Sequence, residues 1–170
     1  MSHHQQKWFG FMEGARAALL QGNSLEYKPT IQLVVEPSFD NHTFLQLQVN
    51  EESVSWHRKT WRKLDDRPKF ADPIENLKYI GRTITPTIEQ GRGEVSREVL
   101  LPIIAFINAM TIKPHFDQPG IVIDGTFYAL TIGTASAHTT YKWHYSPGEW
   151  ADLQKLANMV LELNQKLYQQ

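Results

Sequence analysis

The chain has 170 residues, of which 41% are hydrophobic and 21% are charged, and its formal net charge is −1. This apolar content can build a sizeable core, which excludes global disorder and fits a single domain spanning residues 1–170. The balanced charge excludes a protein-wide field that would steer the chain toward nucleic acid or a membrane. Cysteine is absent, so disulfides, thiolate catalysis and thiolate metal ligands are excluded too.

No segment predicts a targeting signal or a membrane span. The apolar residues of the first two dozen positions are spaced along the chain, whereas a secretory signal contains a continuous apolar run. The longest nearly apolar stretch, residues 99–110, is shorter than the roughly 20 residues that a membrane helix needs. We therefore expect a soluble protein without membrane contact, and the cytoplasm is its simplest location.

The first part of the chain predicts one helix followed by three strands. Apolar residues recur at helical spacing over residues 4–21, and Gly22 is a suitable stop. Residues 30–36 and 43–50 then alternate between apolar and polar side chains, as half-buried strands do. A third strand is expected at 54–61, which gives three antiparallel strands in meander order.

The middle of the chain predicts helices. Asp72, Pro73 and Glu75 combine an N-cap, a proline in the first turn and an acid three residues after the cap. The "QGRGE" stretch at 90–94 has the composition of a loop. Residues 95–112 are apolar on nearly every side, which predicts a buried helix with a possible kink at Pro102.

The last third predicts three more strands and a final helix. Asp124-Gly125 is a two-residue hairpin signal between the apolar runs 120–123 and 126–133, and residues 139–145 alternate as a last strand. Ser146-Pro147-Gly148-Glu149 predicts a helix start. The helix that follows has one apolar stripe: Leu153, Leu156, Val160, Leu163 and Leu167.

Together these elements predict an α+β fold. Its order is a helix, a three-strand meander, helices, a second three-strand meander and a C-terminal helix. We expect one antiparallel sheet of five or six strands with helices mainly on one face. Antiparallel sheets can leave their second face in contact with water, so that face is a candidate interaction surface.

Alternation assigns the side chains of the last strand to two faces. Trp143 lies on the inward row, continued by Trp150 at the start of the helix, and both are expected in the core. If Trp56 in the third strand is buried, the same rule predicts that His57, Lys59 and Trp61 point outward to solvent. The candidate partner-binding residues on the open face are His57, Lys59, Trp61, His138, Lys142 and His144.

No pattern predicts a metal site, a cofactor or a catalytic centre. His138 and His144 share a strand face but are about 20 Å apart along it, too far to hold one ion whose ligand bonds are about 2 Å long. The chain has no HExxH, GxSxG, Walker or GxGxxG motif. We therefore expect no metal, no cofactor and no assigned catalytic residues, and an enzyme is the less favoured class.

The stretch "WHRKTWRKLDDRPK" at 56–69 interleaves basic and aromatic residues. Such a pattern can hold phosphates and stack bases. Charges that protect a sheet edge from aggregation explain it equally well, and nucleic acid is an unfavoured partner for a chain of this net charge.

The sequence favours a small protein-binding module, for example of the immunity or inhibitor type. Such a module would neutralise or regulate a protein with an acidic surface through the open sheet face, with Trp61 as anchor. One alternative is an enzyme or small-ligand binder with its site between sheet and helices. A second alternative is nucleic-acid binding through residues 56–69. The sequence leaves the partner and the oligomeric state open.

Overall fold

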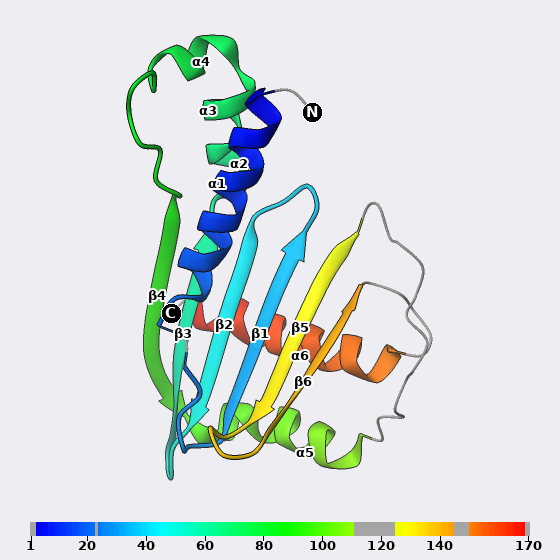
Figure 1. Ribbon diagram of the computed structural model, residues 1–170. Helices are drawn as coiled ribbons and strands as arrows, with labels where there is room; N and C mark the ends of the chain where they lie inside the picture. The colour runs from blue at the N-terminus through cyan, green and yellow to red at the C-terminus, as the bar shows by residue number, and fades with distance from the viewer. Residues whose placement is uncertain (1–2, 23, 111–124, 145–149, 169–170) are drawn as a thin grey trace.

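The computed structural model describes residues 3–22, 24–110, 125–144 and 150–168. It contains one six-stranded antiparallel sheet with the strand order β4-β3-β2-β1-β5-β6 (Figure 1). The predicted α+β class, the antiparallel sheet and its upper strand number are therefore confirmed. The elements in chain order are α1 (His3–Leu20), β1 (Thr30–Pro37), β2 (His42–Val49), β3 (Ser53–Trp61), α2 (Lys63–Asp66), α3 (Pro68–Ala71), α4 (Pro73–Leu77), β4 (Ile88–Ser96), the short 3-10 helix η1 (Arg97–Leu100), α5 (Leu101–Ala109), β5 (Thr126–Gly133), β6 (His138–His144) and α6 (Ala151–Tyr168).

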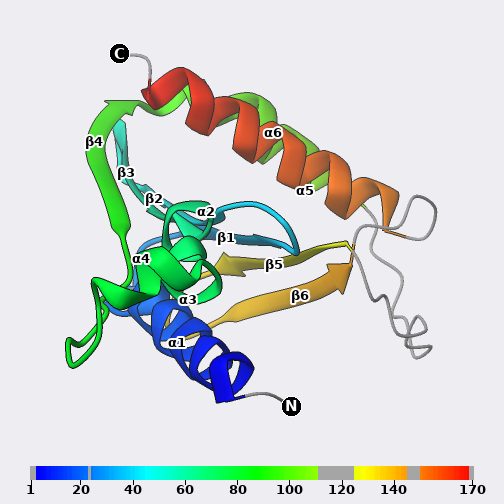
Figure 2. The same cartoon turned by 90° about the horizontal axis from the view of Figure 1, so that it is seen from above.

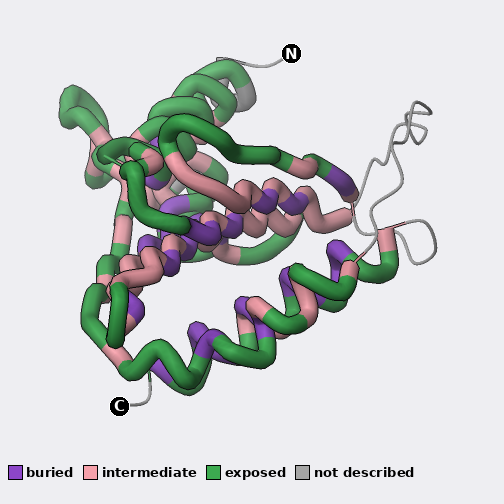
Figure 3. The backbone as a smooth tube through the Cα atoms, turned by 90° about the horizontal axis from the view of Figure 1, so that it is seen from below, coloured by how far each residue is buried: buried purple, intermediate pink, exposed green. Residues whose placement is uncertain are grey.

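One face of the sheet is covered by α5 and α6 (Figure 2). The apolar rows of the strands, such as Leu33 in β1 and Leu45 in β2, meet the leucine stripe of α6 in the main hydrophobic core. All five predicted stripe residues of α6 are buried, and buried positions recur along this helix and the central strands (Figure 3). Burial of these apolar side chains is the main force that holds the two layers together.

The opposite face carries a second, smaller core at one end. There α1 packs on β2 and β3, and its residues Ala15 and Leu19 are buried with Phe44 and Trp61. Trp8 and Phe11 of α1 lie between the ring of Trp61 and that of Phe70 in α3, which makes an aromatic cluster. Offset and edge-to-face ring contacts of this kind add to the stabilisation by burial. This helix covers only part of the face, as Figure 1 shows.

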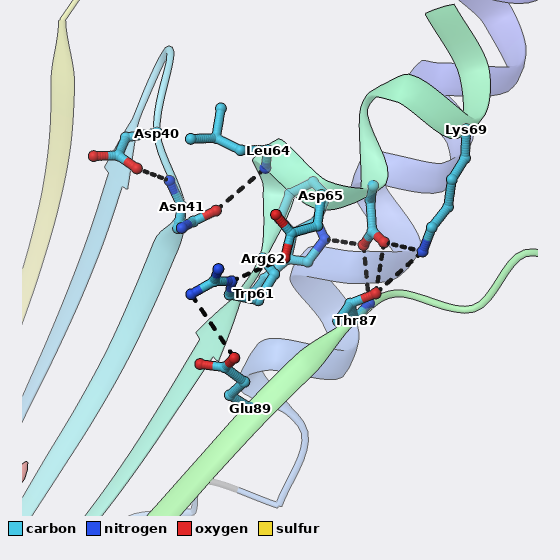
Figure 4. Close-up of polar contacts among 10 residues, drawn as sticks. Asp40, Asn41, Trp61, Arg62, Leu64, Asp65, Lys69, Thr87 and Glu89 are labelled. Atoms are coloured by element: carbon cyan, nitrogen blue, oxygen red, sulfur yellow. Dashed lines mark hydrogen bonds and ion pairs between the residues drawn. The ribbon is translucent and has the colours of Figure 1, made fainter. Parts of the chain in front are cut away.

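A buried carboxylate fixes the end of β3 to the start of β4. Asp66 accepts hydrogen bonds from Trp61 Nε1 at 2.8 Å, from the Thr87 N–H at 2.9 Å and from Thr87 Oγ1 at 2.7 Å. Lys69 Nζ lies 2.5 Å from Oδ1, the oxygen that also accepts from the Thr87 hydroxyl (Figure 4). Burial alone would raise the pKa of Asp66, but the hydrogen bonds from Lys69, Thr87 and Trp61 hold it below its usual value.

The prediction of a loop at 90–94 was wrong, because these residues belong to the edge strand β4. Gly91 and Gly93 occupy its positions opposite Arg58 and Trp56, so the apolar alternation that marks a strand is missing. The predicted helix 95–112 is correspondingly shorter, and α5 begins at Leu101. Pro102 lies in the first turn of α5, where a missing amide N–H costs nothing, and it does not kink a longer helix.

Of the two predicted helix starts, the structure describes only the one at Asp72. The Asp72 cap is confirmed, since its side chain accepts from the Ile74 and Glu75 N–H groups. The proposed strand 120–123 and the helix start at 146–149 lie outside the described residues. Within the described part of the chain, no helix has the length and apolar character needed to cross a membrane.

Trp143 is a core residue, as the sequence predicted. Its side chain is 2% exposed, its ring stacks on Tyr128, and its Nε1 donates to Gln154 Oε1 of α6 at 3.0 Å. Trp150 stacks on the outer side of Trp143 but is only half-buried. The pair joins the last strand to the last helix, with most of the buried area on Trp143.

We expect Trp143→Ala to lower the free energy of unfolding by about 3–5 kcal/mol, because it opens a large cavity and leaves Gln154 without its donor. Trp150→Ala should cost clearly less, since part of that side chain already contacts water. Urea unfolding followed by circular dichroism measures both changes. Equal losses for the two variants would contradict this assignment of the core.

Asp66→Asn should destabilise the protein in a pH-dependent way. Because the folded pKa of Asp66 lies below the unfolded value of about 3.9, its contribution to stability is present above that value and is lost as the pH falls through the folded pKa. We expect a loss of about 2 kcal/mol at neutral pH and convergence of variant and wild type in acid. If the two free energies of unfolding differ by the same amount from neutral to strongly acidic pH, Asp66 is not ionised in the folded protein.

Candidate binding face on the open sheet

A polar row crosses the sheet on the face that α1 only partly covers. The strand register pairs one residue from each strand with the next, from edge to edge. Residues opposite each other in a sheet point to the same face. The polar row is defined by these six residues: Arg92, His57, Gln46, Gln32, Thr131 and Thr140.

The position of α1 explains where the polar row begins. Phe44 and Trp61 lie on the same face as the row, but nearer to α1, and both are buried beneath it. Lys59 lies at the border, where its Nζ donates to the carbonyl of Gln21 directly after the C-terminal end of α1. Two residues further along β3, on the same face, His57 is half-buried. Along β2 the face therefore changes from apolar and covered at Phe44 to polar and open at Gln46.

The side chains of the polar row also bond to one another. Gln32 Nε2 donates to Gln46 Oε1 at 3.3 Å, and the hydroxyls of Thr131 and Thr140 lie 2.8 Å apart. Such cross-strand contacts hold the polar groups in fixed positions at a modest gain of stability. The row thus presents an ordered set of hydrogen-bonding groups at the surface.

A shallow hollow of about 780 Å³ lies at the β4 end of the row. Its polar lining comes from three adjacent strands: Gln46, Gln48, Ser55, His57, Gln90, Arg92 and Glu94. Gly91 and Gly93 also line it, and the ring of Trp56 packs against these two glycines. Both donors and acceptors therefore converge on the hollow, with both charge signs at its outer edge.

His57 is a neutral donor and acceptor in this setting. Burial lowers its pKa, and the charges of Lys59 and Arg92 lower it further, against a hydrogen bond with Gln90 that raises it. The lowered pKa favours the neutral ring at neutral pH.

In the described part of the chain, the open face carries charged side chains of both signs. Arg92 stands at one end of the face and Lys142 near the other, and both are exposed. Two carboxylates lie at the lower border of the same face, but each has a partner within the chain. Glu26 Oε2 accepts from Gln48 Nε2 at 2.6 Å, and Glu94 accepts from the hydroxyl of Ser53. Both donors are neutral, so the two carboxylates keep their charge at the border while the two cations stand along the open part of the face.

The structure places four of the six predicted residues on the accessible part of this face. The register puts His138 and Lys142 on the same face as His57, and both are exposed. His144 is half-buried, with its ring 5.5 Å from that of Phe127. Whether these residues bind a partner stays a prediction.

Exposure of the other two residues was predicted wrongly. Trp61 is fully buried beneath α1 and bonded to Asp66, so it cannot anchor a partner. Lys59 is 7% exposed, and burial lowers the pKa of its amine. Alternation correctly placed both residues on this face, but it carries no information on which part of the face α1 covers.

The residues missed by the sequence analysis come mainly from β4. Arg92 was assigned to a loop, so its place beside His57 was invisible. Thr131 and Thr140 were passed over as ordinary strand residues, although their cross-strand pairing completes the row. The available signal was the alternation of side chains along β5 and β6, which places both threonines on the face that does not carry the apolar rows.

Neither of the alternative sites gains support from the described residues. The space between the sheet and α5 and α6 is filled by apolar side chains. Among the residues described, no group of three or more His, Asp or Glu side chains is arranged to hold a metal ion. The basic stretch 56–69 is divided, because Trp61 and Lys63 are buried and Arg58 stacks on Tyr168 on the other face.

The glycines of the hollow give a matched test of its construction. A Cβ on Gly93 would lie 2.8 Å from Trp56 Nε1, whereas a Cβ on Gly91 would lie 3.2 Å from the nearest atom of that ring. We expect Gly93→Ala to destabilise the protein by about 1–2 kcal/mol and Gly91→Ala to cost less. Urea unfolding and the emission maximum of tryptophan report the two effects, and equal costs would contradict the packing of Trp56 on Gly93.

Comparisons of the chain with models of protein families, with curated proteins and with solved structures gave no match. No activity or ligand is therefore transferred from a relative. The function has to be argued from the geometry and chemistry of the open face itself.

Proposed function

We propose that this protein is a binding module that receives a protein partner with an acidic surface on its open sheet face. The observation that carries the proposal is the polar row, in which all six strands contribute one residue to a single accessible line. Neutralisation or regulation of the partner, as by an inhibitor, is the proposed consequence of its binding.

The shape of the face favours a macromolecule over a small molecule. Small-ligand sites are usually concave, largely apolar and enclose most of the ligand. The hollow at the β4 end is instead shallow and open, has polar side chains from three strands in its lining, and continues into the rest of the row. A surface of this kind suits the polar, water-bridged contacts of a reversible protein interface.

The two exposed cations of the face favour an acidic partner. Arg92 and Lys142 are exposed and far apart on the face, so they would meet separate carboxylates of the partner. Cations at the rim of an interface mainly raise the association rate and select the partner. The histidines add hydrogen-bonding groups, and His57 does so without charge.

The proposal predicts that Gln46→Glu combined with Lys142→Glu weakens partner binding without loss of fold. Gln46→Glu adds a negative charge at the centre of the row and keeps the side-chain shape. The partner is first isolated from extract of the native cell with the wild-type protein and identified by mass spectrometry. Calorimetry should then show affinity lower by at least about tenfold for the double variant, most clearly at low ionic strength.

Lys166→Glu is the control, because it reverses the charge of an exposed lysine on α6, as Lys142→Glu does on the open face. It should bind the partner as the wild type does. Equal affinity of the double variant and the control at low ionic strength would contradict the assignment of the binding face. The thermal melts of all variants should agree, because every substituted side chain other than Gln46 is exposed.

A further inference from the structure

The outer backbone edge of β4 pairs with no other strand among the described residues, and its hydrogen-bonding positions follow from the register with β3. The Arg62 N–H donates to the Thr87 carbonyl at 2.9 Å, and the Arg97 N–H donates to the Glu52 carbonyl at 3.1 Å. Both pairs continue the β3–β4 register, one at each end of the strand. Because hydrogen-bonded pairs alternate along an antiparallel ladder, the odd-numbered residues of β4 bond to β3.

The even-numbered residues of β4 therefore turn their N–H and C=O groups outward. The central three are Gln90, Arg92 and Glu94, and all three are exposed. The register with β3 runs from Ile88 to Ser96 without a bulge, and no proline occurs in the strand. Among the described residues none pairs with this outer edge, and β4 forms one border of the sheet in Figure 1.

Natural edge strands are commonly blocked by proline, bulges, short length or a charged side chain. Of these devices β4 has only charges, and its charges are of both signs. Self-pairing of such a strand depends on which charges become opposite each other, because like charges directly opposite destabilise a sheet and unlike charges stabilise it.

A two-fold axis perpendicular to the sheet allows only registers in which one residue of β4 lies opposite itself. An axis at Arg92 sets two arginines against each other, and an axis at Gly91 sets Arg92 against Gln90. An axis at Gly93 sets Arg92 of each copy against Glu94 of the other. That register forms two ion pairs. It also places Gly93, which has no side chain, on the axis, where the two β4 strands approach each other most closely.

We propose that β4 pairs antiparallel with β4 of a second copy of this chain, with Gly93 on the two-fold axis and with reciprocal Arg92–Glu94 ion pairs. The two sheets then form one continuous twelve-stranded sheet. Since the axis is perpendicular to the sheet, the open faces of both copies lie on the same side. The opposite edge strand, β6, has one lysine, two histidines and no carboxylate, so it cannot form such reciprocal pairs with itself.

Charge-swap variants test this register directly. Arg92→Glu sets two pairs of acids against each other across the axis, and Glu94→Arg sets two pairs of arginines against each other. We expect either change to raise the dimer dissociation constant by about tenfold or more. Sedimentation velocity over a range of concentrations at low ionic strength measures this constant.

The double variant Arg92→Glu with Glu94→Arg restores two unlike pairs and should dimerise as the wild type does. An equimolar mixture of the two single variants should form a heterodimer, because each then supplies the charges that the other lacks. This result also shows that both single variants are folded. A monomeric wild type, or a dimer that resists both single changes, would overturn the proposal.

Discussion

The burial of Trp61 is the constraint on which the rest of the structure depends. Its ring is buried in the small core under α1, and its Nε1 donates a hydrogen bond to the buried carboxylate of Asp66. Asp66 in turn holds Thr87 and with it the start of β4. One side chain thus connects the N-terminal helix, β3 and the edge strand β4. A buried carboxylate is stable only with such a complete set of donors.

This constraint divides one face of the sheet into two parts with different chemistry. Beneath α1 the face is apolar, and the aromatic rings of Trp8 and Phe11 complete it. Beyond the end of α1 the same face carries only hydrogen-bonding groups at its centre, from Arg92 at one edge to Thr140 at the other. The opposite face needs no such division, because α5 and α6 supply an apolar layer for it.

The open part of the face and the β4 edge meet at Arg92. This residue ends the polar row, lines the hollow and stands on the strand whose outer backbone groups are free. If two copies pair through β4, Glu94 of each copy comes to lie beside Arg92 of the other, and the two polar rows become neighbours. Partner binding and self-association would then influence each other through this one position.

The sequence predicted most of the strands and the layers, because alternation and helical stripes depend on burial alone. β1, β2, β3 and α6 fall where their patterns predicted them, and so does the core position of Trp143. β4 was missed because Gly91 and Gly93 leave room for the ring of Trp56 and thereby erase the alternation. The burial of Trp61 and Lys59 could not be predicted, since a strand pattern distinguishes two faces but not the part of a face that a distant helix covers.

The central claim is that α1 covers the open face only as far as Phe44 of β2. From Gln46 onward the polar row is accessible to solvent. The chain has no cysteine, so single introduced thiols report accessibility without background. Phe44→Cys and Gln46→Cys place a thiol on the same face of β2, two residues apart. Under native conditions we predict that a maleimide modifies Gln46→Cys at nearly the rate of the unfolded chain, while Phe44→Cys reacts only through opening of the structure. Equal protection of the two thiols would contradict the account.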